Sequence, residues 1–324
     1  MNKVLYYILL ALWYALSLLP LRVHYVFSDI LFLLVYHVFG YRKALVRRHL
    51  AESFPEMSDE ERQKTERGFY HWLCDYFVET IKMLTISKKN LMRRMTFKGT
   101  DTVNEIVNSG QSVALYLGHY CNWEWITSLP LWFSEKAQCG QIYHPLENAV
   151  VDRLFLRLRQ RLGALCIPMA ETLRRLAYFR KIGKPVIIGY ISDQVPFWNN
   201  IHHWLEFLNH DTPVLTGTER LVRGAGHAVF YVDIHRPRRG YYEAELKLIA
   251  RDPKQTKDYE LTDAYFRMLE QTIRHDPKCY LWTHNRWKRT HEEFNLRYDP
   301  ATGRVSLEPL EEIIKRKEGE NQET

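Results

Sequence analysis

Residues Ser112–Glu124 read SVALYLGHYCNWE, a short apolar run that passes directly into a polar segment led by glycine. An apolar run of this length, ended by glycine, is typical of a buried strand followed by a turn. A histidine comes directly after the glycine, and a glutamate follows it five positions later. The stretch therefore predicts a strand that delivers His119 and Glu124 to its carboxyl end.

The same pattern repeats on the C-terminal side of this stretch, where short apolar runs alternate with amphipathic ones. The predicted strands are 113–117, 139–143, 164–167, 186–191, 228–232, 242–249 and 280–283, and the predicted helices are 124–133, 148–162, 172–182, 216–223 and 258–275. This alternation favours an α/β fold with a central mixed, mainly parallel sheet and helices on both faces. In open sheets of this class, sites lie beyond the carboxyl ends of strands, where Gly118 and His119 fall.

His119 and Glu124 have side chains suited to acid–base chemistry. Histidine titrates near neutral pH, and a carboxylate on its second ring nitrogen fixes the tautomer and stabilises the imidazolium. Residues five apart are separated by about 140° around a helix axis, so His119 must precede a helix that begins near Asn122. We predict His119 as a general base for a substrate hydroxyl, oriented by Glu124. The alternative is a turn-closing histidine followed by a first-turn acid.

Other residues in this half of the chain are candidates for substrate binding. Arg159 is predicted to clamp a phosphate or to lie near the oxyanion, because a guanidinium suits bidentate anion recognition. Asp152 lies two helical turns earlier on the same side and is predicted to help orient Arg159, although a solvated charged face is the alternative. Asp193 follows a predicted strand and is either a site group or a turn cap. Cys121 is either a thiol nucleophile or, as we favour, a small side chain that fills a tight turn.

The N-terminus is the most apolar part of the chain. Residues 4–21 contain no charge, residues 25–41 contain one acid, and four basic residues follow within 42–48. We predict residues 1–40 to be a membrane anchor, either one spanning helix or a helical hairpin that lies partly in the leaflet. The basic residues place the following chain on the cytoplasmic side. Two buried core helices are the alternative.

The overall composition indicates which kinds of partner the protein binds and whether its compartment is reducing. The 324 residues carry 45 Lys and Arg against 38 Asp and Glu, a formal net charge of +7 that favours an anionic partner. Five dispersed cysteines without a C-x-x-C pair favour a reducing compartment and argue against a disulfide framework or a zinc site. After the anchor we expect a helix over 58–86, a catalytic domain over 41–305 and a charged tail over 306–324 that forms a short, fraying helix.

Six blocks of the chain, in order, resemble motifs of the late acyltransferases of lipid A biosynthesis, the lauroyl and myristoyl transferases within the lysophospholipid acyltransferase superfamily. The blocks are Tyr41–Glu56, Gly118–Glu124, Tyr143–Gly163, Ser192–Gln194, Phe207–Thr216 and Tyr280–Lys288. The second block resembles the family's G-H-x-G-N-W-E, and the fourth resembles its D-Q element. The resemblance extends from about Val4 to Lys288.

The resemblance implies an acyltransferase of lipopolysaccharide biosynthesis at the cytoplasmic face of the inner membrane. Its donor would be an acyl carrier protein thioester, and its acceptor a lipid A precursor or a related glycolipid whose hydroxyl attacks directly, without an acyl-enzyme. No cofactor and no metal are expected. The predicted substrate-binding residues are Asn122, Asp152, Arg159, Asp193, Gln194 and Arg286.

The chain departs from the family pattern at three positions. Cys121 and Asn209 stand where glycine is usual, and His144 stands where arginine is usual. The change at His144 leaves open a lysophospholipid or an amino-acid lipid as acceptor. A non-catalytic lipid-binding protein on this fold is a further alternative, against which the intact His119 and Glu124 argue. The apolar N-terminus and the lack of a recognition motif argue against nucleic-acid binding.

Overall fold

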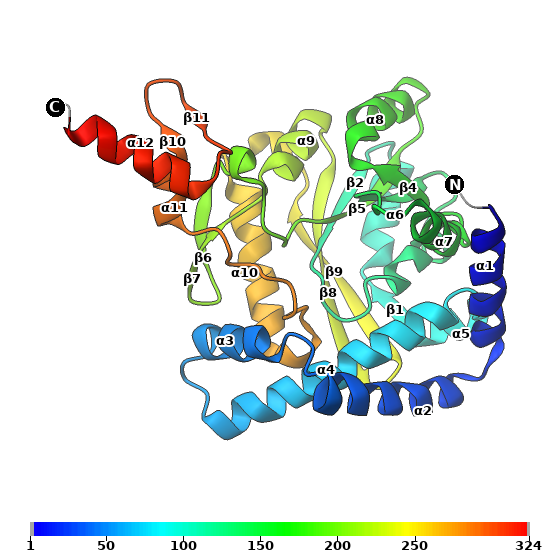
Figure 1. The fold of residues 1–324 in the computed structure, drawn as a ribbon. Helices are drawn as coiled ribbons and strands as arrows, with labels where there is room; N and C mark the ends of the chain where they lie inside the picture. The colour runs from blue at the N-terminus through cyan, green and yellow to red at the C-terminus, as the bar shows by residue number, and fades with distance from the viewer. Residues whose placement is uncertain (1–2, 323–324) are drawn as a thin grey trace.

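The structure, a computed structural model, describes residues 3–322. Its centre is a seven-stranded mixed sheet with the strand order β1-β9-β8-β2-β5-β3-β4, surrounded by helices (Figure 1). The strands are β1 (Met95–Lys98), β2 (Val113–Leu117), β3 (Gln138–Tyr143), β4 (Leu165–Pro168), β5 (Val186–Ile191), β8 (Ala228–Arg238) and β9 (Tyr241–Ala250). Only the β8–β9 pair is antiparallel among the pairs of this sheet. The predicted mixed, mainly parallel sheet is confirmed.

The strand at the centre of the prediction is also the centre of the core. Every residue of β2 is buried, because β5 and β8 pair with it on either side and helices cover it. A continuous apolar run such as Val113–Leu117 is what a parallel strand covered on both faces requires. The carboxyl end of β2 is therefore held rigidly where the polar segment begins.

From residue 43 onward the α-helices are α3 (Lys43–Ser53), α4 (Asp59–Lys82), α5 (Lys88–Arg94), α6 (Thr100–Asn108), α7 (Ala149–Gln160), α8 (Thr172–Lys181), α9 (Gly217–Ala225), α10 (Glu260–His275), α11 (His291–Arg297) and α12 (Leu310–Gln322). The predicted helical runs 58–86, 148–162, 172–182, 216–223 and 258–275 are helices in the structure, whereas α3, α5, α6 and α11 were not predicted. Ser58 starts α4 with a capping box, in which its hydroxyl accepts from the Glu61 N–H while the Glu61 carboxylate accepts from the Ser58 N–H. The fraying predicted for the tail falls partly outside the described residues.

Two predicted elements differ from the structure, and several short strands, among them β1, were not predicted. Residues 280–283 were predicted as a strand but form only an isolated bridge, Tyr120 with Tyr280. The run predicted as a helix over 124–133 is a 3₁₀-helix, Trp125–Leu131, with Pro130 inside it. A two-stranded hairpin of β6 (Trp204–Phe207) and β7 (His210–Pro213) lies in a segment for which no strand was predicted, and β10 (Tyr298–Asp299) pairs with β11 (Arg304–Val305).

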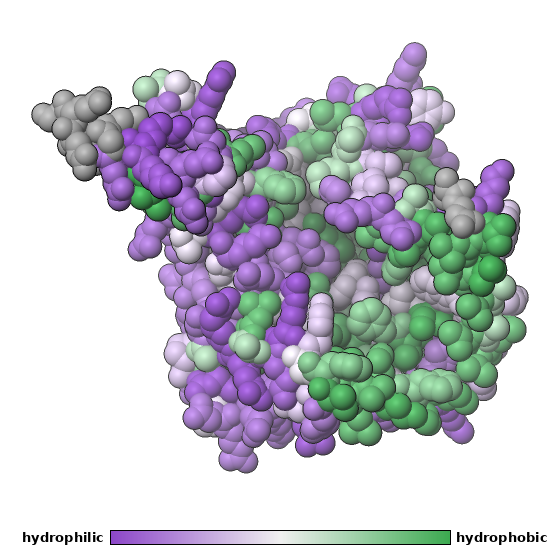
Figure 2. Space-filling model, viewed as in Figure 1, coloured by the Kyte–Doolittle hydropathy of each residue, from purple (hydrophilic) through white to green (hydrophobic). Residues whose placement is uncertain are grey.

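The N-terminal helices lie against the body of the protein. They are α1 (Lys3–Leu18) and α2 (Leu21–Phe32), which continues as a π-helix through Leu33–Val38, and both contact α4 (Figure 1). By length and composition alone, Leu21–Val38 is the one helix within the described residues that is long and apolar enough to cross a membrane. The outward faces of α1 and α2 form the apolar, green surface at the lower right of Figure 2.

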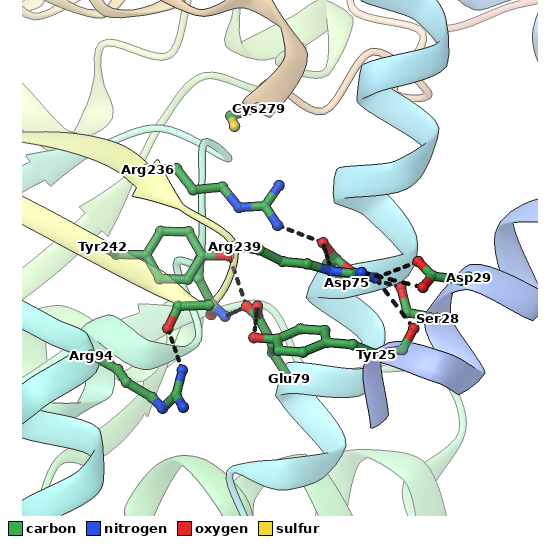
Figure 3. A network of polar contacts seen from close by, with 12 residues as sticks. Tyr25, Ser28, Asp29, Asp75, Glu79, Arg94, Arg236, Arg239, Tyr242 and Cys279 are labelled. Atoms are coloured by element: carbon green, nitrogen blue, oxygen red, sulfur yellow. Dashed lines mark hydrogen bonds and ion pairs between the residues drawn. The ribbon is translucent and has the colours of Figure 1, made fainter. Parts of the chain in front are cut away.

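A buried carboxylate on α4 fastens α2 to the β8–β9 hairpin (Figure 3). Asp75 accepts hydrogen bonds from Ser28 Oγ at 2.6 Å, from Arg236 Nη2 at 2.5 Å and from Arg239 Nη2 at 2.6 Å. Arg239 also bonds Asp29 of α2 at 2.6 Å. Each charge in this group therefore has an opposite charge within hydrogen-bond distance.

A second buried carboxylate, one turn further along α4, extends the network toward the segment after β2. Glu79 accepts from the hydroxyl of Tyr25 at 2.9 Å, from the hydroxyl of Tyr242 at 2.7 Å and from the Asn122 side-chain amide at 2.7 Å. Burial raises the pKa of Glu79, and the charge of Arg236 and the hydrogen bonds from Tyr242 and Asn122 oppose the shift. Glu79 thus links α2 to the segment that carries His119.

Candidate active site

The sheet register places His119 beside Asp193. Strands β2 and β5 are parallel neighbours, and Leu117 pairs with Ile191 at their carboxyl ends. His119 and Asp193 each lie two residues beyond that pair, so the two chains leave the sheet side by side. Gly118 precedes His119, and a Cβ there would lie 2.6 Å from Leu269 Cδ1, so any other residue would force the buried Leu269 side chain to move.

Asp193 holds the imidazole of His119 by two contacts. Its Oδ1 lies 2.7 Å from His119 Nδ1, and its Oδ2 accepts the His119 backbone N–H at 3.0 Å. Since an ionised carboxylate only accepts, Nδ1 carries the proton and Nε2 is left as the basic nitrogen. The Asp193 side chain is 2% exposed, whereas that of His119 is 19% exposed. The pair is thus anchored on the protein side and open on the other.

The ionised form of Asp193 is favoured by its neighbours. Burial alone would raise the pKa of Asp193, but His119 and the buried guanidinium of Arg286 hold it below its usual value. Arg286 was predicted to bind substrate, yet it is 1% exposed and donates from Nη2 to the Pro213 carbonyl at 2.8 Å. The structure therefore places Arg286 behind Asp193 and away from the surface.

The open side of His119 faces an amide and an aromatic ring. The side-chain nitrogen of Gln194 lies 3.4 Å from His119 Nε2, a weak contact that a substrate hydroxyl can replace. The Trp123 ring meets the imidazole edge-on, with 5.2 Å between centroids, and lies 4.2 Å from the ring of Tyr76. Gln194, predicted as a site residue, is thus brought to the reactive nitrogen.

Glu124 does not make the contact that its spacing from His119 predicted. Its two carboxylate oxygens accept from Arg159, with Nε at 2.8 Å and Nη2 at 2.5 Å, and Tyr76 approaches at 3.5 Å. The carboxylate and guanidinium side chains are 2% and 18% exposed. The orienting contact on His119 belongs to Asp193, and Glu124 and Arg159 form a second, bidentate pair that Tyr76 and Trp123 connect to the imidazole.

Two other predicted residues lie apart from His119 in structural roles. Asp152 accepts the Leu146 N–H at 2.9 Å and so braces the loop before α7, and no contact with Arg159 is present within residues 3–322. Asn122 is fully buried: its oxygen accepts the Trp125 N–H at 3.0 Å, and its nitrogen donates to Glu79. Both contacts are internal to the protein, so the structure shows a structural role for Asn122, which was predicted to bind substrate.

At two of the three departures, the backbone conformation explains why the family usually has glycine there. Cys121 has φ 53° and Asn209 has φ 60°, in the left-handed region where glycine is favoured. Cys121 is fully buried, and burial raises the pKa of its thiol well above the usual value, which opposes a thiolate nucleophile. His144 is exposed, and its Nδ1 lies 2.9 Å from the neighbouring Pro145 carbonyl oxygen.

The pairing of His119 with Asp193 was not predicted, although both residues were named. They are 74 positions apart, and a sequence does not state which strands are neighbours. The sequence does contain a feature that could have predicted the pairing. His119 and Asp193 each lie two positions after an apolar run that is typical of a strand. Adjacent parallel strands bring such positions together.

A family model matches most of the chain. The model of a family described as bacterial lipid A biosynthesis acyltransferase matches residues 1–289, which include both strand ends, the Glu124–Arg159 pair and the N-terminal helices. A search of curated proteins gives no match.

Proposed function

The chain belongs to the bacterial lipid A biosynthesis acyltransferase family and is an acyltransferase, and we propose that it transfers a fatty acyl chain from an acyl carrier protein thioester to a hydroxyl of a lipid A precursor. His119 is the general base in this proposal, and Asp193 takes the orienting role first given to Glu124. The observation that carries the proposal is the 2.7 Å contact of Asp193 with Nδ1, which leaves Nε2 as the basic nitrogen.

The proposed reaction is a direct displacement. Nε2 of His119 removes the proton of the acceptor hydroxyl as its oxygen attacks the thioester carbonyl carbon, and the C–S bond breaks as the tetrahedral intermediate collapses. The imidazolium then returns the proton to the departing thiolate. Asp193 stabilises the imidazolium through Nδ1, as the carboxylate does in a Ser-His-Asp triad, and Gln194 leaves Nε2 when the hydroxyl arrives.

Arg159 is proposed to bind negative charge next to this centre. Glu124 occupies its Nε and Nη2, and Nη1 makes no hydrogen bond within the described residues. The bidentate pair fixes the plane of the guanidinium, so Nη1 is presented in one direction. That donor would contact the oxyanion or an acceptor phosphate, and Glu124 acts by holding Arg159.

The donor and the location are proposed from charge and from exposed apolar surface. Acyl carrier proteins are acidic, which fits a chain of net charge +7. The outward faces of α1 and α2 expose many large apolar side chains, which favours contact with a lipid bilayer. We propose the cytoplasmic face of the inner membrane, because basic residues follow the apolar segment.

The test is acyl transfer by His119→Ala. Purified enzyme, acyl carrier protein thioester and a lipid A precursor are combined, and the acylated product is measured by mass spectrometry. We expect a loss of roughly 10²–10⁴-fold in rate, the contribution of a positioned base. The exposed His202 supplies the matched control, His202→Ala, which should retain the parent rate.

Two results would overturn the proposal. If the His119→Ala enzyme were folded and transferred acyl chains at nearly the parent rate, His119 would not be the general base. Acylation of an offered lysophospholipid, with none of the lipid A precursor, would keep the chemistry and replace the acceptor, the alternative that His144 leaves open.

A further inference from the structure

We propose that a groove between α1 and α7 binds one anionic phospholipid of the bilayer, with an acyl chain along α1 and the headgroup phosphate on Arg157 and Arg161. The groove has a volume of about 500 Å³. It lies outside the His119 site, and the proposal rests on the membrane association proposed above.

The floor of the groove is one apolar face of α1. Its residues recur at helical spacing: Tyr7, Leu10, Ala11, Tyr14, Ala15 and Leu18, with Leu84 beside them. Ala11 and Ala15 are small and exposed, so the surface is hollowed between the larger neighbours. From Tyr7 to Leu18 the helix rises by about 17 Å, which offers an extended track for a lipid chain.

The rim of the groove on the α7 side is positively charged. Arg157 and Arg161 are exposed and one helical turn apart, and no carboxylate lines the groove. Arg161 donates from Nη2 to the Ile86 carbonyl at 2.6 Å, which holds its guanidinium at this position, and Arg157 has no partner within residues 3–322. An apolar track that ends at two arginines complements a lipid with a negatively charged headgroup.

The groove is continuous with the proposed membrane surface and is firmly built. The outward faces of α1 and α2 beside it are apolar (Figure 2). The inner face of α1 is tied to α4 by Trp13 Nε1 to the Ile81 carbonyl at 3.1 Å, and by Lys82 Nζ to the Ser17 carbonyl at 2.7 Å. These hydrogen bonds fix the position of α1 against α4, so the groove has a firm floor beside the exposed apolar surface.

The experiment measures binding of the full chain to phosphatidylcholine vesicles with and without an equal amount of phosphatidylglycerol. The parent should prefer the anionic vesicles, and Arg157→Gln with Arg161→Gln should reduce that preference by about fivefold per arginine. Arg180→Gln with Lys181→Gln, which removes two exposed charges from α8, is the matched control and should retain the preference.

A second variant separates a groove from a simple basic patch. Ala11→Leu with Ala15→Leu fills the groove but keeps both arginines and adds apolar surface, so it should bind neutral vesicles at least as well as the parent and lose the anionic preference. Retention of the preference by Arg157→Gln with Arg161→Gln or by Ala11→Leu with Ala15→Leu, or its absence in the parent, would overturn the proposed groove. If Arg157→Gln with Arg161→Gln raised the KM for the acceptor in detergent, the groove would bind the acceptor substrate and not a bilayer phospholipid. A parent that bound neither vesicle would contradict the membrane association itself.

Discussion

Two buried carboxylate clusters of this molecule use the same chemistry for different ends. At the ends of β2 and β5, Asp193 holds His119, and the ring is left open on its Nε2 side. Between α2, α4 and β8–β9, Asp75 and Glu79 are enclosed by arginine, serine, tyrosine and asparagine donors (Figure 3). The two clusters differ in what remains open to substrate: His119 has an exposed nitrogen, whereas each charge of the second cluster already has a protein partner.

The comparison shows how to distinguish a reactive polar cluster from a structural one. Both contain fully buried carboxylates, so burial alone does not mark a site. A reactive cluster combines a fixed side with an exposed group that can exchange partners, as His119 does through its weak 3.4 Å contact with Gln194. In the structural cluster each carboxylate is held by several protein donors, and removing a charged partner leaves a buried charge unpaired.

The largest predicted effect is on catalysis, in Asp193→Asn. The amide is similar in size but can favour the wrong imidazole tautomer and cannot stabilise the imidazolium, so the rate should fall by roughly 10²–10⁴-fold. Acyl transfer is measured across pH, with thermal unfolding as a check that the variant is folded. A second histidine–carboxylate pair, His203 with Asp263 at 2.7 Å, supplies the control Asp263→Asn, which should keep the parent rate. Equal losses in both variants would contradict the special role of Asp193.

The next effect is on stability, in Asp75→Asn. Removing this buried charge leaves Arg236 and Arg239 without their shared carboxylate, which should cost about 3–5 kcal/mol in the free energy of unfolding. Denaturant unfolding in detergent measures it, and the exposed Asp101→Asn should change little. A normal unfolding free energy together with a large loss of rate would reverse the assignment of the two clusters.

Most of the fold was predictable because the strands are continuous apolar runs. The predicted strands 113–117 and 186–191 have the bounds of β2 and β5, since a central strand covered on both faces leaves no polar position within it. The 280–283 run was mistaken for a strand because Tyr280 and Trp282 are buried aromatic residues held by tertiary contacts without a paired neighbour along their length.

The site was predictable in its residues but not in its pairings. Position after a strand was enough to single out His119 and Asp193, whereas the partner of His119 depends on strand order, which local patterns do not encode. The five-residue spacing favoured Glu124, but the turn after β2 directs that side chain to Arg159 of α7. The burial of Arg286 also depends on tertiary packing around Asp193, and no local pattern distinguishes it from the exposed basic residues that follow.

The smallest predicted effect is in Tyr25→Phe, which tests whether the enclosed network only stabilises the fold. The variant loses the hydroxyl that donates to Glu79 Oε1 but keeps the ring beneath Arg239, whose guanidinium carbon lies 4.5 Å from the ring centroid. One lost hydrogen bond to a buried carboxylate should cost about 1–3 kcal/mol, seen as a lower unfolding temperature, while the exposed Tyr178→Phe should show no change. Glu79 still holds Asn122, so the acyl-transfer rate of Tyr25→Phe should stay near that of the parent. A large fall in rate with little loss of stability would mean that α2 controls the segment bearing His119, and the division into one reactive and one structural cluster would no longer hold.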